Sequence, residues 1–240
     1  MASRTTRAVA RTALAVVATA AVAGCSVYED LTTSDFAKQG VSDVVSASLD
    51  TMTEVDSLRM TGQLWLKGRS HFVDLHLSRS GDCTGSLTYD GSHVDVRGVD
   101  GKAWVKGDVG FINTAGGGAA LPQATKERLA RSWIPLGTRQ ARDLCAFEKL
   151  FDKYGVVHED DEVADLTRGE EVSLDGMKAV VVTGTDGGVA TQRAWIATDD
   201  PHYVLKITQE GGREPAALAF SEFDQEFEVE PPPAKDVLRS

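Results

Sequence analysis

Residues 58–66 read Leu58-Arg59-Met60-Thr61-Gly62-Gln63-Leu64-Trp65-Leu66. Apolar side chains occupy the even positions, apart from Gly62, and mostly polar side chains occupy the odd ones. Because successive side chains of a β-strand point to opposite faces of a sheet, this period of two predicts a strand with one buried face. The alternation returns in residues 71–77, 83–89 and 93–97. It indicates antiparallel strands, which commonly bury one face and expose the other.

Asp-Gly pairs separate many of these alternating stretches. They occur at residues 90–91, 100–101, 175–176 and 186–187. Asp-Gly suits a two-residue hairpin turn, in which both central residues need a positive φ. Further strands are expected at 163–174, 177–183, 189–198, 202–207, 218–220 and 227–229. The pattern predicts a meander that ends near the three prolines at 231–233, because proline cannot donate a hydrogen bond to a sheet.

Helices are expected beside this sheet. In residues 41–52 the apolar side chains recur at spacings of three and four, which places them on one face of a helix. Residues 123–133 predict a short helix, and residues 139–154 predict a longer one that Thr138 caps and Gly155 ends. The fold class is then α+β, with a single curved antiparallel sheet and about three helices that cover its concave face.

The first 24 residues have the features of an export signal. Three arginines precede an almost wholly apolar run of about a dozen residues, too short for the roughly 20 that a membrane-spanning helix needs. Val22-Ala23-Gly24-Cys25 follows and resembles the lipobox of bacterial lipoproteins. The resemblance implies that residues 1–24 are removed, that Cys25 carries a diacylglyceryl thioether, and that the protein is held on the extracytoplasmic face of the cell membrane. An ordinary secreted protein with a cysteine near its cleavage site is the alternative.

The remaining chain is long enough for one domain with its own core. We expect residues 25–34 to be the lipidated cysteine and a tether, residues 35–233 the single domain, and residues 234–240 a C-terminal tail. Without the three arginines of residues 1–24, the formal charge of −11 becomes −11 − 3 = −14. So acidic a surface repels phosphate, which argues against nucleic acid as a partner. It should also hold the folded part away from an anionic membrane.

Two cysteines remain if Cys25 is acylated. An even number of cysteines in an oxidising compartment favours a disulfide between Cys83 and Cys145. Two separate buried thiols are the alternative. Neither residue has another cysteine or a histidine at the spacing of a metal site, so no metal is expected.

No group of residues in the sequence points to catalysis or to a cofactor. Residues 81–85 match the Gly-x-nucleophile-x-Gly pattern of hydrolases, but an alternating strand follows them where a helix would be required. His71 and His76 are five apart on one strand and therefore point to opposite faces. The acidic run at 158–162 lacks the spacing of a calcium loop. We expect no enzymatic activity, no catalytic residue and no cofactor.

The alternating strands place many apolar side chains on one face of the sheet. Three helices are few to cover so long a face, and incomplete cover would leave an apolar cavity. A fully packed core is the alternative. The side chains expected on this face, and hence the candidates for lining a cavity, are Leu58, Met60, Leu64, Leu66, Val73, Leu75, Leu77, Leu87, Val94, Val96, Tyr203, Leu205 and Ile207.

Several features resemble the actinobacterial lipid-carrier lipoproteins of the LppX and LprG family and, more distantly, the periplasmic carrier LolA. They are the lipobox, the helix before the meander, Ala194-Trp195-Ile196-Ala197 with residues 201–206, and Phe220-Ser221-Glu222-Phe223 with residues 229–232. The resemblance implies a half-barrel sheet wrapped around helices, with an apolar cavity for acyl chains. Residues 113–120 are polar and glycine-rich where an entrance loop would lie.

Two functions are consistent with these features. The first is a membrane-anchored lipoprotein that binds a lipid, a glycolipid or another amphiphile in the cavity, with acylated Cys25 as its membrane attachment. The second is an envelope protein-interaction or sensing module on the same fold, with a protein partner and no ligand. Lipid that co-purifies with the protein would distinguish the first function from the second.

Overall fold

The computed structural model describes residues 33–66, 68–115, 120–146, 166–186 and 189–239. Ser34–Ser240 forms one compact unit, separate from Met1–Thr33, and it contains its own hydrophobic core and disulfide. The export signal, Cys25 and the tether as far as residue 32 lie outside the described residues. No helix within the described ranges is long and apolar enough to span a membrane.

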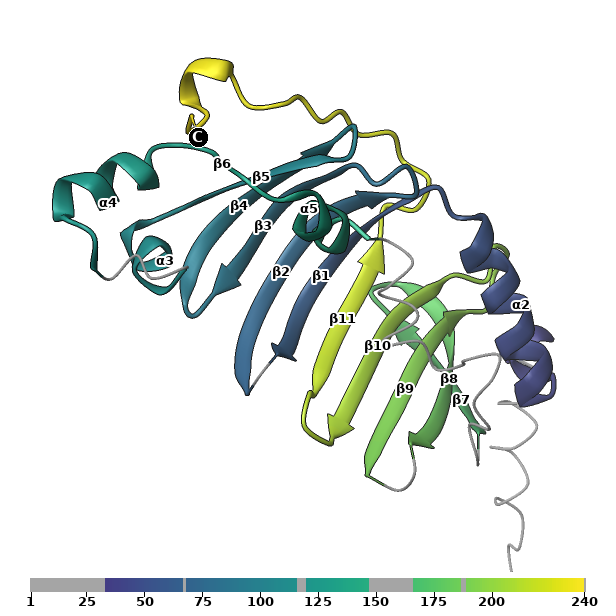
Figure 1. The fold of residues 1–240 in the computed structure, drawn as a ribbon. Coiled ribbons are helices and arrows are strands. Elements are labelled where there is room, and N and C mark those ends of the chain that lie inside the picture. Colours follow the sequence, from purple (N-terminus) through teal and green to yellow (C-terminus); the bar gives the residue numbers. More distant parts are fainter. Residues whose placement is uncertain (1–32, 67, 116–119, 147–165, 187–188, 240) are drawn as a thin grey trace, which may run out of the picture. The chain divides into compact units, whose positions relative to one another are not determined.

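The described residues form one antiparallel sheet of eleven strands, which curves into an open half-barrel (Figure 1). This confirms the prediction of a single curved antiparallel sheet. In chain order the strands are β1 (Ser57–Leu66), β2 (Arg69–Ser78), β3 (Cys83–Tyr89), β4 (Ser92–Val99), β5 (Lys102–Gly107), β6 (Ile134–Pro135), β7 (Thr167–Leu174), β8 (Met177–Asp186), β9 (Ala190–Ala197), β10 (Val204–Gly211) and β11 (Ala216–Ser221).

The strand order in the sheet is β6-β5-β4-β3-β2-β1-β11-β10-β9-β8-β7. The chain runs from β1 outward to one edge, resumes at the other edge, and returns inward as a second meander. The two meanders join where the first strand pairs with the last, with Met60 opposite Phe220. The centre of the sheet therefore depends on a contact between the first and the last strand.

Three of the four Asp-Gly pairs form the hairpin turns that the sequence predicts. Asp90, Asp100 and Asp175 have φ angles of 51°, 53° and 51°, and the glycine after each also has a positive φ. These turns connect β3 to β4, β4 to β5 and β7 to β8. Gly187 of the fourth pair lies outside the described residues.

The described residues include four α-helices, where the sequence predicts about three. They are α2 (Val41–Glu54), α3 (Val109–Thr114), α4 (Gln123–Ala130) and α5 (Thr138–Leu144), with the short 3-10 turns η1 (Phe36–Lys38) and η3 (Ala234–Asp236). The unpredicted helix is α3, at whose start the Asp108 carboxylate accepts a hydrogen bond of 2.8 Å from the Phe111 amide. The helix expected at 139–154 ends at Leu144, and residues 147–154 lie outside the described part.

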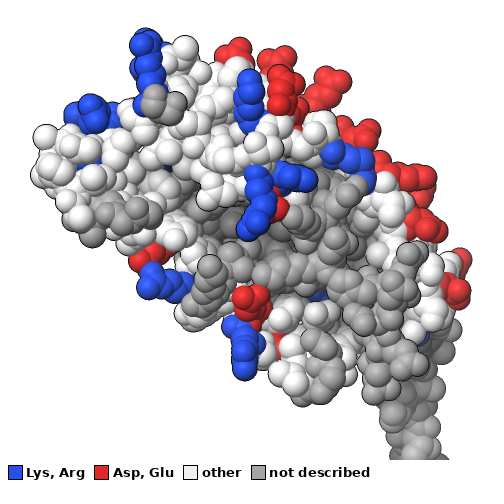
Figure 2. All heavy atoms as spheres, in the orientation of Figure 1, with Lys and Arg blue, Asp and Glu red and all other residues white. Residues whose placement is uncertain are grey.

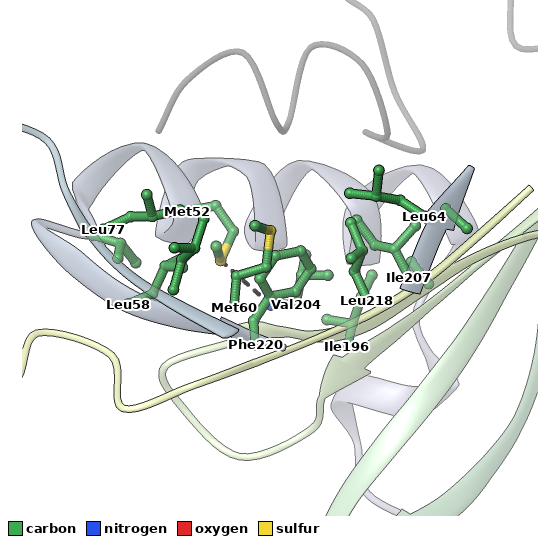
Figure 3. Close-up of a cluster of buried hydrophobic side chains, with 14 of the residues drawn as sticks. Met52, Leu58, Met60, Leu64, Leu77, Ile196, Val204, Ile207, Leu218 and Phe220 are labelled. Carbon is green, nitrogen blue, oxygen red and sulfur yellow. Dashed lines mark hydrogen bonds between the residues drawn. The ribbon is translucent and has the colours of Figure 1, made fainter. Parts of the chain in front are cut away.

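Helix α2 packs against the concave face of the sheet, which we call the inner face. Val44, Val45 and Met52 of this helix are buried in the main hydrophobic core. Figure 3 shows Met52 among side chains from the middle of the sheet, including Leu58, Met60, Val204 and Phe220. The Val204 amide donates a hydrogen bond of 3.4 Å to the sulfur of Met52. The predicted apolar stripe of residues 41–52 thus covers the inner face around β1 and β9–β11.

A disulfide joins Cys83, at the start of β3, to Cys145, just after α5, with Cα atoms 5.4 Å apart. This is the pairing that the cysteine count favours. Cys83 lies opposite Gly98 of β4. A Cβ atom at Gly98 would overlap the sulfur of Cys145, so the glycine leaves the space that the disulfide occupies. Helix α5 is thereby linked covalently to the sheet.

Candidate ligand-binding pocket

The end of the inner face formed by β3–β6 is hollowed into a pocket of about 610 Å³. Side chains of these strands form its floor, and residues of α3, α4 and α5 contribute the opposite wall. The volume lies within the ~300–1,000 Å³ that is typical of small-molecule sites. Fourteen described residues line the pocket: Leu87, Tyr89, Val94, Val105, Phe111, Ile112, Ala115, Leu121, Leu129, Ile134, Leu136, Gln140, Leu144 and Leu238.

The surface of this pocket is mostly hydrocarbon. Among the described lining residues, only Tyr89 and Gln140 have polar side-chain atoms, and none carries a charge at neutral pH. The Gln140 side-chain oxygen accepts a hydrogen bond of 3.3 Å from the Gly137 amide. A charged group that entered the pocket would lose its hydration without gaining a charged partner. The pocket therefore suits an acyl chain or another apolar group.

Helix α3 supplies the aromatic part of the wall. The Asp108 cap fixes where this helix begins, and Phe111 and Ile112 reach the pocket from it. The Phe111 ring packs edge to face on Tyr89 of β3, with ring centroids 5.8 Å apart. Gly107 makes this arrangement possible, because a Cβ atom there would lie 2.5 Å from the Phe111 ring. A short loop-and-helix segment thus places an aromatic pair at one end of the sheet.

The mouth of the pocket lies beside α4. Tyr89, Leu121 and Gln140 line the pocket and are also exposed to solvent. Helix α4 has no buried residue, and Leu129 is its lining residue. Because so little apolar surface holds this helix, its displacement costs little packing energy.

The C-terminal segment closes another side of the pocket. The Trp133 amide donates to the Asp236 carbonyl at 2.7 Å, and the Trp133 carbonyl accepts from the Leu238 amide at 2.8 Å. The Leu238 side chain then reaches the pocket. Residues 234–239, which the sequence suggests to be a tail, therefore belong to the folded unit.

Residues 227–229, expected to be a strand, have irregular backbone.

Most of the residues predicted to line a cavity are divided between the pocket and the main core. Leu87 and Val94 line the pocket. Val73 packs, partly buried, against the main core, and the side chain of Leu66 lies outside the described part. The remaining inner-face residues are buried in the main core beside the pocket: Leu58, Met60, Leu64, Leu75, Leu77, Val96 and Ile207.

One predicted cavity residue points to the opposite face of the sheet, because β10 contains a bulge. The register between β10 and β9 shifts between Val204 and Lys206. A shift of one residue reverses the faces of the side chains that follow. Leu205 consequently packs against Ala179 in a second, smaller core, and the expectation that it lines the inner face is wrong. Tyr203 packs partly against both cores and does not line the pocket.

Most of the pocket lining lies in residues 105–144, between the two groups of strands that the alternating pattern predicts, so the pattern did not identify these residues. A signal is nevertheless present, because Phe111, Ile112 and Ala115 recur at the three- and four-residue spacing of a helix. The glycine-rich stretch 113–120, where an entrance loop is expected, borders the pocket through Ala115.

Cys83, His71 and His76, which were considered as catalytic or metal-binding candidates in the sequence, do not line the pocket. Cys83 is held in its disulfide and is not a free nucleophile. Nδ1 of His71 lies 2.8 Å from the Thr88 carbonyl, whereas His76 lies 3.6 Å from the carboxylate of Glu222. Within the described ranges, no three His, Cys, Asp or Glu side chains gather as a metal ion would require.

No protein-family model matches the chain, and no curated protein matches its sequence. Among solved structures, the fold is similar to that of the lipoprotein LppX from Mycobacterium tuberculosis, with a TM-score of 0.53 and 18% identity. That match covers 79% of this chain and 98% of LppX. LprF from Mycobacterium bovis matches with a TM-score of 0.52 and 11% identity over 80% of this chain and 96% of that chain. The chain therefore has an LppX-like fold, in agreement with the resemblance seen in its sequence.

Proposed function

We propose that this protein binds the acyl chains of a lipid or another amphiphile, as a carrier attached to the extracytoplasmic face of the cell membrane. The observation that carries the proposal is the pocket of about 610 Å³, whose described lining contains no charged side chain. Each methylene group buried there would contribute about 0.8 kcal/mol to binding. The affinity for an acyl chain should therefore rise with the length of the chain. The amide of Gln140 and the phenol of Tyr89 are the polar groups among the described lining side chains, so most of the pocket surface can contact hydrocarbon.

The orientation of the ligand follows from the same lining. Hydrocarbon would occupy the floor at Leu87, Val94 and Val105, and the polar end would remain at the mouth near Tyr89 and Gln140. These two side chains can exchange hydrogen bonds with an ester or hydroxyl group. The polar end keeps its remaining hydration because both residues are exposed.

The attachment to the membrane is supported by the lipobox at Cys25. LppX, whose fold is similar, is itself named as a lipoprotein. A diacylated cysteine supplies two chains, which give stable membrane attachment where a single chain is marginal. A carrier held in this way remains close to the bilayer that supplies its ligand.

A pocket-filling variant tests the proposal. The unit 34–240 should bind a fluorescent fatty-acid probe, and Leu129→Trp should weaken that binding at least tenfold with little change in the urea midpoint. The tryptophan would fill space that is already empty, on a helix with no buried residue. Val172→Trp is the matched control, because Val172 is exposed on β7 at the opposite edge of the sheet.

A packed-core variant completes the comparison. Leu75 is 4% exposed in the main core, so Leu75→Trp should overpack it and cost about 1–3 kcal/mol. Mass spectrometry of an organic extract of the purified protein would identify any bound lipid. No probe binding by the unmodified unit, together with no lipid in the extract, would refute the proposal.

A second candidate function is a protein-interaction module on the same fold. Its support is an exposed aromatic pair on the outer face, Trp65 of β1 and Phe72 of β2, which are 37% and 57% exposed. They are diagonal neighbours, since Trp65 lies opposite Ser70 and Phe72 lies opposite Gln63. Aromatic side chains of this kind are enriched in protein interfaces. A partner captured by the unmodified protein and lost with Phe72→Ser would favour this function.

A further inference from the structure

Four arginines occupy the outward faces of the helices beside the pocket. Arg128 lies on α4 and Arg131 directly follows it, while Arg139 and Arg142 lie on α5. All four are exposed, whereas Leu129 and Ala141 of the same helices face the pocket and the core. Both helices contribute residues to the wall of the same pocket, and we call their four exposed arginines together the arginine surface.

Among the described residues, the arginines of this surface are unpaired, although Glu127 lies on α4 and Asp143 on α5. Within the described part of the chain, the four guanidinium groups form no ion pair and no side-chain hydrogen bond. Two exposed basic residues elsewhere are paired, Lys38 with Asp35 and Arg193 with Glu210. A cluster of unpaired guanidinium groups has its full hydrogen-bonding capacity available for phosphate, which it can bind in a bidentate manner.

The charge of the chain is distributed unevenly. Residues 120–146 contain five basic and two acidic side chains, a net charge of +3, in a chain whose formal charge is −11. Residues 222–230, which lead away from β11, contain five acidic side chains and no basic one. Figure 2 shows Asp and Glu along the upper right edge of the molecule, whereas Lys and Arg lie over the part where Figure 1 places α4 and α5.

The arginine surface adjoins the mouth of the pocket. Arg128 precedes Leu129, and Arg139 precedes Gln140, and both of these neighbours line the pocket. Leu121, which is exposed and also lines the pocket, lies just before α4. An exposed apolar side chain beside basic helices is typical of segments that lie at a membrane interface.

We propose that the arginine surface docks the pocket mouth onto an anionic lipid bilayer. The arginines would contact lipid phosphates, Leu121 would enter the interface, and the acidic edge would face away from the membrane. Repulsion of that edge orients the molecule, and the arginines, which lie within a Debye length of the bilayer, act against the overall negative charge. The proposal is the alternative to the expectation that so acidic a protein is held away from an anionic membrane. The docking does not require a ligand in the pocket, although it gives the proposed carrier a route for exchange.

Vesicle sedimentation tests the proposal, with the unit 34–240 used so that no acyl anchor contributes. The unit should bind vesicles of phosphatidylcholine mixed with phosphatidylglycerol, and binding should fall steeply with added salt. Vesicles of phosphatidylcholine alone should not bind it. Changing Arg128, Arg131, Arg139 and Arg142 together to glutamine should reduce binding by roughly fivefold for each arginine, and so by more than a hundredfold in total.

A charge-matched control removes four basic groups elsewhere. Changing Lys38, Lys102, Arg193 and Arg213 to glutamine lowers the net charge equally and should reduce binding far less. The two proposals are tested separately, because Leu129→Trp should lose the fatty-acid probe and still bind anionic vesicles. Equal loss in the control and the arginine variant, or equal binding to neutral vesicles, would overturn the inference. A dimer in light scattering that the arginine variant dissociates would assign the surface to a second copy of the chain, and would also overturn it.

Discussion

Glu171 ties an edge of the sheet to the start of the folded unit. Its carboxylate accepts hydrogen bonds from the Ser34 amide at 3.0 Å and from Nζ of Lys178 at 2.9 Å. Burial raises the pKa of Glu171, but the hydrogen bonds from Ser34 and Lys178 and the charge of Lys178 outweigh burial and lower the pKa from 4.5 to about 2. Nearby, Arg168 donates hydrogen bonds to two backbone carbonyls at the end of η1. Single side chains on β7 thus hold the segment that leads into α2.

Glu171→Gln should lower the free energy of unfolding by about 2–3 kcal/mol near neutral pH. The pKa of Glu171 is lower in the folded state, so its charged form stabilises the fold above the unfolded-state pKa of 4.5, and this contribution is lost as the pH falls toward 2. Urea unfolding curves of the two proteins should therefore differ most above this range and converge below it. A difference that is independent of pH would show that packing, and not charge, is responsible.

Cys25→Ser should release the protein from the membrane fraction. The substitution removes the thiol that would carry the diacylglyceryl group, and with it both acyl chains. Immunoblots of membrane and soluble fractions after a high-salt wash would measure the change, with Ser26→Ala as the matched control. The wash matters because the arginine surface would otherwise retain some protein electrostatically. Retention of the Cys25→Ser protein after the wash would contradict the lipoprotein assignment.

At the scale of elements, α5 illustrates how a short helix is held in place. It spans seven residues, Thr138–Leu144, too few for an isolated helix to be stable in water. Ala141 is its buried residue, and the disulfide at Cys145 fixes its end to β3. Because α5 contributes Gln140 and Leu144 to the pocket, the disulfide also shapes the candidate site.

Changing Cys83 and Cys145 together to serine should destabilise the unit by up to about 4 kcal/mol, the chain-entropy estimate for a closed loop of this length. The same variant should bind the fatty-acid probe more weakly, because the wall formed by α5 is no longer fixed. Circular dichroism melting and probe titration would measure the two effects. Non-reducing peptide mapping of the unmodified protein should find both cysteines in one linked peptide, and two free thiols would refute the pairing.

Gly98 provides an independent control for the same element. A Cβ atom at this position would overlap the sulfur of Cys145, so Gly98→Ala should destabilise the oxidised protein. The reduced protein can move its thiols and should be affected less. Gly137→Ala is the comparison, because a Cβ there meets its nearest neighbour, in Gln140, at an ordinary 3.5 Å. An equal effect of Gly98→Ala on both redox states would contradict the close approach.

At the scale of the whole molecule, the C-terminal segment connects the middle of the sheet with the pocket. It leaves β11 at Glu222, whose carboxylate accepts a 3.0 Å hydrogen bond from Arg59, while Arg59 also pairs with Asp74 at 2.8 Å. Hydrogen bonding to Asp74 and Glu222 raises the pKa of Arg59, and the hydrogen bond from Arg59 lowers the pKa of Asp74. The segment ends at Trp133 and places Leu238 in the pocket. Strands far apart in the sheet are therefore bridged by one extended piece of chain.

Removal of residues 234–240 should open the pocket and weaken probe binding. The truncation deletes Leu238 from the lining and both backbone hydrogen bonds to Trp133, so the melting temperature should also fall. Leu238→Ala separates these effects, because it keeps the backbone hydrogen bonds and removes the side chain. Arg239→Gln, at an exposed position, is the neutral control. Unchanged probe affinity after truncation would show that the segment is not part of the site.

The features that depend on local chemistry could be predicted from the amino-acid sequence alone. Alternation in residues 58–66 and its repeats predicted antiparallel strands and most of their inner-face side chains, because the period of a strand is set by its own backbone. Asp-Gly pairs predicted the hairpins, since a two-residue turn requires positive φ at both positions. The amphipathic stripe of α2 was equally visible. These features need no information about distant parts of the chain.

Where the inner face is packed and where it is hollow depends on how distant parts of the chain pack together. A cavity is the difference between the space that a curved sheet encloses and the side chains that fill it, so its position depends on elements far apart in sequence. Helix α2, with fourteen residues, fills the middle of the sheet, whereas the shorter α3, α4 and α5 leave space at the β3–β6 end. The bulge that reverses Leu205 and the pairing of β1 with β11 are likewise contacts between distant strands, which a local period cannot contain.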